Sequence, residues 1–416
     1  MIDTVKDVKA KLGFDVLGIN IKSEIQEHLI NAPVSPITCW VLATGVGKTR
    51  PALLKIKGRK TLIVISQILH EQNWRDEAVK WDVDLSNVTF VCYNSLGNHI
   101  NENWDYIVLD EAHRWMDSYT DLLPQFNFGE LLILSGTLSN DAKKKIYNIG
   151  KPKVYTILTE DAVEWGLLPE PKINVIKLIL DEFNPNCIFS KGKNKAKKTE
   201  KCTWSEWNNK YKFLKADKRP NLEIQCTERQ YYDLITSDIE WAKQTYFKTK
   251  DDNMLMRMKM LGNQRKIWLA NLKTKHVQKL LSKLKNKRVV VFASDIKQAN
   301  ALSKEAVHSK NKDGQSVIDD FNSFKIDKVV SVKQINESMN LVEPEVGIIV
   351  QLASSQESGN KQVSIQNQQR LGRILRNSMP TLYVFVYHNT QDSTYLDKFK
   401  ESIYSDWFHN ITIDKI

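Results

Sequence analysis

The sequence predicts an α/β fold in which two parallel-sheet domains stand in tandem, with a largely helical, basic segment between them. Short apolar runs alternate with amphipathic stretches near the beginning of the chain, and the same texture returns in its last third. The residues in between lack this alternation and are basic and aromatic. A chain of 416 residues is long enough for two or three domains. We therefore expect domains at residues 1–171 and 271–416, joined by a connecting or insertion segment at 172–270.

Composition narrows the class of protein. Hydrophobic residues make up 42% of the chain, enough for buried cores, and the net charge of +11 favours an acidic polymer such as nucleic acid as partner. An ordinary solvated basic surface would give the same charge. The five cysteines are scattered without a CxxC pair, so neither a zinc site nor a disulfide framework is indicated, and a reducing cytoplasm fits. No signal peptide and no run of about 20 apolar residues is found, so we expect no membrane contact.

The first expected strand, residues 38–41, runs into a glycine-rich turn and then a helix. Glycines let backbone N–H groups curve around a phosphate, and the start of a helix adds partial positive charge. Lys48 would reach the β- and γ-phosphates, and the Thr49 hydroxyl would hold Mg²⁺. Leu42 stands where the general phosphate-loop pattern has its first glycine, and an ordinary glycine turn is the alternative. The predicted nucleotide contacts in this loop are Thr44, Gly45, Val46, Gly47, Lys48 and Thr49.

A glutamine precedes this turn within a stretch of helical spacing. Gln26 lies 22 residues before Lys48 and offers one hydrogen-bond donor and one acceptor, as the edge of adenine requires. An exposed helix glutamine is the alternative reading.

Two further strands, at 61–65 and 88–93, end in polar residues. Gln67 follows the first and Ser95 follows the second. Open α/β sheets place ligand contacts just past the ends of their strands, so both residues are candidates for binding.

The apolar run at 105–109 leads directly into two adjacent acids, Asp110 and Glu111. Two carboxylates at the end of a buried strand are costly unless a cation lies beside them. Asp110 would bind the Mg²⁺ carried by a nucleotide, and Glu111 would orient and deprotonate the attacking water. Because the acids follow Lys48 by 62 residues, in the order phosphate loop and then strand-DEAH, we predict ATP hydrolysis.

Small hydroxyl residues follow the next expected strand, residues 131–134. Ser135 and Thr137 would suit a hydrogen-bonded relay between the acidic pair and a bound polymer. A simple turn is the alternative, and the position after the DEAH strand favours the coupling role.

The connecting segment carries a basic run at 191–198 with aromatic residues after it. Lysines interleaved with aromatics suit phosphate contact together with base stacking. A solvated loop over a small aromatic cluster is an equal alternative. The aromatic residues concerned are Trp204, Trp207, Tyr211 and Phe213.

Near the end of the second α/β region, three polar side chains are spaced to share one face of a helix. Gln369, Arg373 and Arg376 lie between the expected strands at 347–350 and 381–387. Two arginines on one face could stabilise the charge of a transferring phosphoryl group. A surface helix with ordinary arginines is the alternative.

In their order along the chain, these motifs resemble those of the superfamily 2 helicases and translocases. The stretches similar to motifs I, Ia, Ib, II and III are ATGVGKT (43–49), SQILHEQNWRDE (66–77), YNS (93–95), DEAH (110–113) and SGT (135–137). Those similar to motifs IV, V and VI are VVVFAS (289–294), INESMNL (335–341) and QRLGRILR (369–376). With Gln72 and Trp74 in motif Ia, the chain looks closest to the DNA-acting branch. That branch includes phage branch-migration helicases, restriction-enzyme motor subunits and Swi/Snf-type translocases.

The resemblance implies two RecA-like domains with ATP and Mg²⁺ between them, and it makes Gln26 an adenine contact. Ser338 stands where motif V usually has glycine, which puts the conformation of that loop in doubt. The implied catalytic residues are Lys48, Asp110 and Glu111 from the first domain and Gln369, Arg373 and Arg376 from the second; Thr49 and Asp110 would hold the metal. The implied nucleic-acid contacts are Gln67, Tyr93, Ser95, Ser294 and Asn340.

The resemblance implies an ATP-dependent DNA helicase or translocase that moves on or remodels DNA in replication, recombination or repair. The expected partner is single-stranded, forked or branched DNA, bound by a monomer in the cytoplasm, of a bacterial host if the protein is phage-encoded. Replication or recombination proteins, or a nuclease subunit, would be its protein partners. The alternatives are an RNA helicase, a nucleotide-gated clamp that binds nucleic acid without unwinding it, and the motor subunit of a restriction complex.

Overall fold

The computed structural model describes residues 2–32, 35–114, 117–192, 197–215, 218–304, 306–311, 313–332, 341–354, 356–358, 361–412 and 414. The chain forms two compact units, the first made of residues 1–176, 274–385 and 394–416 and the second of residues 177–273 and 386–393. The first unit contains both large sheets. This division is coarser than the three expected domains, whose boundaries therefore stay a prediction.

The first sheet has six strands in the order β3-β2-β4-β5-β1-β6. All the pairings between them are parallel. The strands β1 and β2 are buried along their whole length, as expected for continuous apolar runs covered on both faces. Their bounds are β1 Ile37–Leu42, β2 Thr61–Ile65, β3 Val88–Cys92, β4 Asn103–Leu109, β5 Asn127–Ser135 and β6 Lys153–Ile157.

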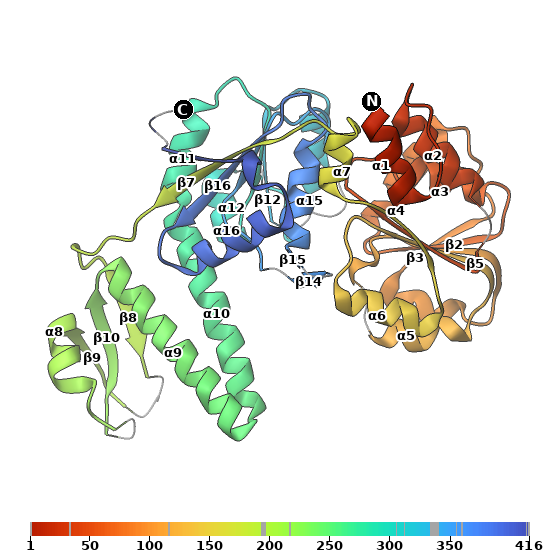
Figure 1. Ribbon diagram of the computed structural model, residues 1–416. Coiled ribbons are helices and arrows are strands. Elements are labelled where there is room, and N and C mark those ends of the chain that lie inside the picture. Colours follow the sequence, from red (N-terminus) through yellow and green to blue (C-terminus); the bar gives the residue numbers. More distant parts are fainter. Residues whose placement is uncertain are drawn as a thin grey trace. The chain divides into compact units, whose positions relative to one another are not determined.

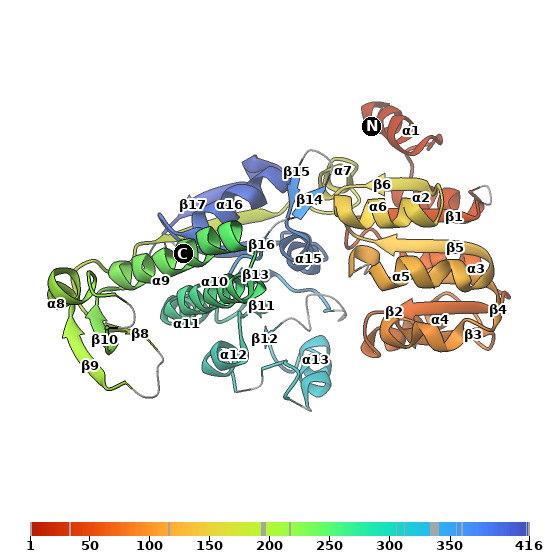
Figure 2. The same ribbon diagram turned by 90° about the horizontal axis from the view of Figure 1, so that it is seen from below.

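Helices cover both faces of this sheet. From β1 the chain passes through β2 to β3 in one direction across the sheet, and from β4 it passes through β5 to β6 in the other direction. Because the crossovers are right-handed, α3 and α4 lie on one face of the sheet and α5 and α6 lie on the opposite face (Figures 1 and 2). The reversal of direction places the carboxyl ends of β1 and β4 at a switch point, where ligands bind in such sheets. The helices and short turns are α1 Ile2–Leu12, α2 Ile21–Asn31, α3 Thr49–Ile56, α4 Leu69–Lys80, η1 Tyr93–His99, η2 Ala112–Arg114, α5 Asp117–Leu122, η3 Leu123–Gln125, α6 Asn140–Ile149 and α7 Thr159–Glu164.

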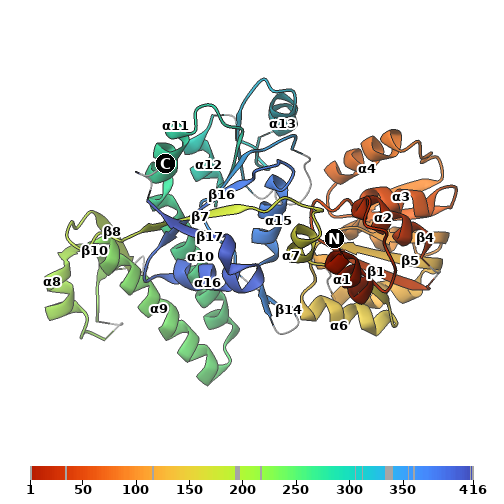
Figure 3. The ribbon, with the colours of Figure 1, turned by 45° about the horizontal axis from the view of Figure 1, so that its top comes forward.

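The second sheet has six strands in the order β12-β11-β13-β16-β7-β17. The strands β16, β7 and β17 are neighbours in Figure 3, although they lie far apart in the sequence. The early strand β7 was expected to belong to the connecting segment, but its residues pair with the last strand of the chain. The strands are β7 Lys172–Leu178, β11 Val289–Phe292, β12 Lys328–Ser331, β13 Val346–Ile349, β16 Thr381–Tyr387 and β17 Phe408–Ile411; a small hairpin is formed by β14 Gln356–Ser358 and β15 Lys361–Val363. The helices are α11 Thr274–Lys283, α12 Ile296–Leu302, α13 Gly314–Asn322, α15 Ile365–Ile374, α16 Gln391–Ser402 and the short turn η5 Ser405–Trp407.

Two parallel sheets of this kind, each flanked by helices, form two RecA-like domains in tandem, so the expected α/β fold class is confirmed. Among the described residues, no helix combines the length and the apolarity that crossing a bilayer would require.

The second unit combines a small sheet with a helical hairpin. Its three strands are β8 Cys187–Lys191, β9 Thr199–Thr203 and β10 Asn221–Cys226, with β10 in the middle. The short α8 Trp204–Glu206 and the π-helical turn η4 Trp207–Tyr211 follow β9, and the long helices are α9 Glu228–Thr249 and α10 Asp252–Leu272. The sequence analysis expected mainly helices here and did not predict this sheet, because its strands are too short and polar to give a clear pattern.

The aromatic residues of the second unit are divided between its core and its surface. Trp207 and Tyr211 are buried with Phe189 in an apolar cluster between the sheet and α9. The rings of Tyr231 and Trp268 stack at 4.4 Å and join α9 to α10. Phe213, in contrast, is 78% exposed. The structure thus contains both the buried cluster and one aromatic side chain that remains accessible.

Candidate active site

The glycine-rich turn after β1 has the backbone geometry of an anion cradle. Gly45 and Gly47 have φ angles of +102° and +90°, in the region where only glycine is unstrained. A Cβ atom on Gly47 would lie 2.8 Å from Nε2 of Gln26. The helix α3 begins at Thr49 with no side-chain cap, so the N–H groups of its first turn are left to bind a ligand. The turn therefore has N–H groups and glycines that suit an anion, and phosphate binding by the predicted loop residues stays a prediction.

Lys48 and Glu111 meet at the end of β1 and β4. Nζ of Lys48 lies 3.1 Å from Oε1 of Glu111, and both side chains are more than four-fifths buried. Glu111 has a φ angle of +53°, an uncommon conformation for a residue with a side chain. Its other oxygen, Oε2, lies 3.2 Å from Nδ1 of His113. Strain at this position is consistent with a functional side chain held in place by its surroundings.

Electrostatics keep this pair charged. Burial alone would raise the pKa of Glu111, but Lys48, followed by His113 and His70, holds it well below its usual range. Burial likewise opposes the charge on Lys48, but Glu111 and Asp110 outweigh it and raise the pKa of Lys48. The two side chains therefore form an ion pair at neutral pH.

Asp110 is held by three groups. Its Oδ1 accepts a hydrogen bond of 3.0 Å from the backbone N–H of Glu111, and its Oδ2 accepts one of 3.0 Å from Nε1 of Trp74. The hydroxyl of Tyr93 donates to its backbone carbonyl at 2.9 Å. Trp74 is 2% exposed and entered the sequence analysis only as a motif residue. Its role as a support of Asp110 was missed, because no pattern in the sequence joins a residue of α4 to the end of β4.

The expected nucleic-acid contact by Tyr93 needs correction. The side chain is 7% exposed, and its ring packs against that of Tyr119 at 5.0 Å. Because its hydroxyl donates to Asp110, the side chain belongs to the core behind the acidic pair and is not presented to a polymer.

We expect the Trp74→Phe substitution to lower ATPase activity and to destabilise the first unit by about 1.5–3 kcal/mol, because it removes a buried hydrogen bond to a carboxylate. Trp104→Phe is the matched control, since Nε1 of Trp104 is buried and has no hydrogen-bond partner within the described chain. Urea unfolding and steady-state ATPase assays measure both effects. Equal losses in the two variants would show that packing alone matters.

The helix α15 lies against the phosphate loop and the DEAH turn within the first unit. Nε2 of Gln369 lies 3.2 Å from Nε2 of His113, which connects α15 to Glu111. A Cβ atom on Gly372 would lie only 2.6 Å from Cβ of Thr44. Glycine at this position is therefore what permits the close approach of α15 to the loop.

Both predicted arginines line a cavity of about 580 Å³ together with the phosphate loop and the acidic pair. Arg373 lies on α15, but α15 ends at Ile374, so Arg376 stands beyond the helix. The expected common helix face is thus wrong for Arg376, although its side chain still reaches the cavity. Burial lowers the pKa of Arg373, and burial together with Arg373 lowers that of Arg376 to about 10, which leaves Arg376 cationic at neutral pH. The predicted residues that line this cavity are Gln26, Thr44, Gly45, Gly47, Lys48, Thr49, Asp110, Glu111, Arg373 and Arg376.

Gln26 contacts the loop itself. Its Nε2 donates to the carbonyls of Val46 and Gly47 at 3.3 and 2.9 Å, and its Oε1 accepts from Nη1 of Arg50 at 2.7 Å. Its carboxamide is thus occupied by the chain, and an adenine contact would require rearrangement. Arg50 also lies 4.5 Å from the ring centroid of Trp81, which lines the same cavity and was missed in the sequence analysis.

The predicted coupling residues form a tight turn after β5. Ser135 is fully buried, and its hydroxyl donates to the carbonyl of Thr137 at 2.6 Å. A Cβ atom on Gly136 would lie 3.1 Å from Oγ1 of Thr44. The turn therefore packs against the phosphate loop, and its role in coupling stays a prediction.

The other predicted nucleic-acid contacts lie outside this cavity. Gln67 and Ser95 follow β2 and β3 and are half-buried and exposed, respectively. The backbone N–H of Ser294 donates to Oε1 of Gln298 at 2.9 Å. Asn340 lies outside the described residues. Their contacts with a polymer stay predictions.

Comparison with known proteins bears on the fold and on the C-terminal part of the chain. Residues 272–378 match the family described as the helicase conserved C-terminal domain. No curated protein sequence matches the chain. The fold is similar to that of S. cerevisiae Dbp5 bound to RNA and ADP BeF3, with a TM-score of 0.57, 11% identity, and coverage of 100% of this chain and 94% of that one. A variant of Dbp5 with the same ligands gives a TM-score of 0.56 with the same identity and coverage.

The helicase domain of Pyrococcus furiosus Hef is also similar, with a TM-score of 0.41, 12% identity, and coverage of 90% of this chain and 96% of that one. At these identities the Dbp5 structures show the shared fold alone, whereas the domain match concerns the sequence. The match of residues 272–378 to the helicase C-terminal domain, together with the tandem RecA-like fold, supports a helicase-type motor that uses ATP.

Proposed function

We propose that the protein is an ATP-dependent DNA helicase or translocase. The observation that carries this proposal is the single cavity in which Lys48, Asp110, Glu111 and Arg373 converge from two RecA-like sheets of one compact unit. A phosphate loop, an acidic pair and an arginine are the parts that ATP-driven motors need.

The residues of this cavity fit ATP and Mg²⁺. The uncapped start of α3 and the cation of Lys48 would bind phosphates. In the structure the carboxylate of Glu111 pairs with Lys48, in the place that a phosphate oxygen would take. Thr49 and Asp110 would hold Mg²⁺, which neutralises phosphate charge when bound. In the described part of the chain no group of three or more His, Cys, Asp or Glu could hold a metal by itself. A site built from one carboxylate, one hydroxyl and phosphates is of the kind that Mg²⁺ uses.

The ion pair with Lys48 would also set the basicity of Glu111. Lys48 is the strongest of the charges that lower the pKa of Glu111. When Lys48 turns to a phosphate, Glu111 loses this neighbour and its pKa rises, which makes it a better acceptor of a proton from water. Arg373 and Arg376 would stabilise charge on the phosphoryl group, and Gln369 would act through His113 as a positioning residue.

The net charge of +11 favours nucleic acid of either kind, and the form of motif Ia favours DNA as the polymer. An RNA helicase is the second candidate, because Dbp5, whose fold is similar, is bound to RNA. Steady-state ATPase measurements with single-stranded DNA, duplex, forked DNA and RNA separate the two. Strong stimulation by DNA, largest with forks, supports the proposal; stimulation by RNA alone would move the protein to the second candidate. No hydrolysis with any polymer would leave a clamp, or a motor that needs a partner subunit.

The second unit is the proposed fork-binding element. Phe213 is exposed between Lys212 and Lys215, which are exposed as well. An accessible ring among lysines can stack on a base while the lysines bind phosphates. Deletion of residues 190–214 would remove Trp207 and Tyr211 from the core, so point substitutions test this element better.

We expect Phe213→Ala combined with Lys212→Glu to lower strand displacement about tenfold, while ATPase without polymer stays unchanged. Phe183→Ala is the matched control, because Phe183 is 89% exposed in the same unit but follows two acidic residues. A fluorescent forked duplex measures unwinding. Equal loss of unwinding and of polymer-free ATPase would speak against a specific role in strand separation.

A further inference from the structure

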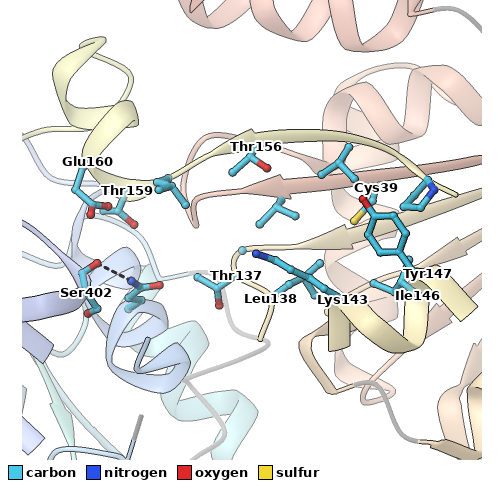
Figure 4. A pocket seen from close by; sticks show the side chains of 16 residues that line it. Cys39, Thr137, Leu138, Lys143, Ile146, Tyr147, Thr156, Thr159, Glu160 and Ser402 are labelled. Carbon is cyan, nitrogen blue, oxygen red and sulfur yellow. Dashed lines mark hydrogen bonds between the residues drawn. The ribbon is translucent and has the colours of Figure 1, made fainter. Parts of the chain in front are cut away.

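A second cavity lies on the face of the first sheet that α6 covers only in part. It has a volume of about 370 Å³ and is lined by β1, β6, α6 and the turn after β5 (Figure 4). In the parallel register Cys39 is the partner of Val154, and Val41 is the partner of Thr156, so these four side chains point to the same face. The two from β1 are buried, whereas Val154 is 43% exposed. We call this hollow the β6 groove.

The rim of the β6 groove is apolar and accessible. Tyr147 of α6 is 54% exposed, and Leu158, just after β6, is 40% exposed. Beneath them, Leu138 and Ile146 are buried and line the cavity. An accessible apolar rim around an apolar hollow is typical of a pocket that receives a large side chain of a partner.

The surroundings of the groove are basic. Lys144 on α6 and Lys151 before β6 are exposed, and Lys143 of α6 lines the cavity itself. In the same stretch Asp141 forms an ion pair of 2.6 Å with Lys145. Glu160, which lines the far end of the cavity, is 6% exposed. Three lysines in and beside an apolar hollow, Lys143, Lys144 and Lys151, are complementary to an acidic partner.

One polar group at the end of the groove is suited to a backbone donor. Nε2 of Gln368 donates to the carbonyl of Ser402 at 3.2 Å, whereas Oε1 of Gln368 is buried and has no partner among the residues that the structure describes. A buried acceptor without a donor is costly, and a peptide N–H would satisfy it.

We propose that the β6 groove docks an acidic peptide segment of a partner protein, with one large apolar side chain inserted between α6 and β6. The apolar hollow favours a peptide over nucleic acid, because a phosphodiester backbone could use the lysines but would leave the hollow unfilled. This proposal concerns another surface than the ATP cavity and does not rest on the proposed function. Since Thr137 and Gln368 line the groove, a bound peptide would contact the turn after β5 and the helix α15 together.

Fluorescence anisotropy with labelled synthetic peptides tests the proposal on the full-length protein. Each peptide carries one Phe, Trp, Leu or Ile flanked by Asp and Glu, and its control carries Ser in place of the apolar residue. We expect at least one peptide to bind with a Kd of about 10–100 μM and its Ser control to bind at least tenfold more weakly. Raised salt should weaken binding, since the lysines are exposed.

Variants locate the binding on the protein. Tyr147→Ala and Val154→Glu change exposed rim residues and should each weaken the peptide about tenfold. The double variant K144E and K151E should do the same and lose the salt dependence, whereas K285E and K297E, an equal change of charge elsewhere, should not. Thermal melting checks that the variants fold.

Two results would overturn the proposal. One is that no peptide binds with a Kd below about 1 mM. The other is that the rim and lysine variants leave peptide binding unchanged, or that the lysine variant weakens a labelled single-stranded oligonucleotide and no peptide, which would make the surface a nucleic-acid contact.

Discussion

The Glu111→Gln variant is expected to lose at least about 100-fold of the steady-state ATPase rate while it still binds ATP. The substitution keeps the size and polarity of the side chain but removes the carboxylate that would accept a proton from water. It also removes the negative charge that Lys48 Nζ contacts at 3.1 Å, so Lys48 becomes more available to phosphate. Nucleotide affinity should therefore be unchanged or higher, which a fluorescent ATP analogue measures by equilibrium titration.

Two further variants make this result specific. Glu401→Gln, an exposed glutamate on α16, should leave both rate and affinity unchanged. Lys48→Ala should weaken nucleotide binding itself, because it removes the cation from the cradle. If Glu111→Gln turned over ATP at a rate near that of the wild type, Glu111 would not be the water-activating base.

The second large effect concerns stability. Lys273 and Asp392 form an ion pair of 2.7 Å in the second unit, with side chains that are 0% and 1% exposed. Asp392 also accepts the backbone N–H of Tyr387 at 3.1 Å. We expect Lys273→Met to lower the free energy of unfolding of this unit by about 3–5 kcal/mol, because it leaves a buried carboxylate without its cation.

A double substitution and an exposed pair serve as controls. Lys273→Met with Asp392→Leu should be more stable than Lys273→Met alone, since no unpaired charge remains. Lys279→Met breaks an ion pair with Asp414 whose partners are 52% and 80% exposed, and should cost less than about 1 kcal/mol. Hydrogen exchange followed in urea measures these differences, in amides of the second unit for the Lys273 variants and in amides of the first unit for Lys279→Met. Similar values for Lys273→Met and Lys279→Met would contradict the argument.

The same lysine gives a pH dependence of defined sign. Burial, only partly offset by Asp392, lowers the pKa of Lys273 below its ordinary value of 10.5. The unfolded chain therefore binds this proton more tightly than the folded one. Between the folded pKa and 10.5, unfolding free energy should rise with pH through this group, and the rise should be absent in Lys273→Met.

The sequence predicted the parts of the candidate site that depend on consecutive residues. A buried strand, a glycine turn and a helix start follow one another around Lys48, and a buried strand ends in the two acids, so local backbone rules place each part at the carboxyl edge of a parallel sheet. Because the carboxyl ends of β1 and β4 lie together at the switch point of the first sheet, Lys48 and Glu111 come together although they are 63 residues apart. The roles of these residues stay predictions that the variants above test.

Only the tertiary structure decided the contacts between residues on different elements. In the structure Gln26 donates to the loop carbonyls, and Tyr93 is buried behind Asp110. Trp74 of α4 donates to the carboxylate of Asp110. The helix α15 also ends before Arg376. None of these contacts has a period or a spacing in the sequence that could reveal it.

Fold-level details show the same division. Apolar runs indicated most strands of the two sheets, but not that β7 and β17, from distant parts of the chain, would pair with each other. The pairing of Lys273 with Asp392 was equally invisible. Periodicity and turn residues determine which elements form and where their ends lie. Which side chains meet depends on how those elements pack, because contacts over long chain separations are selected by the shape and burial of the whole unit.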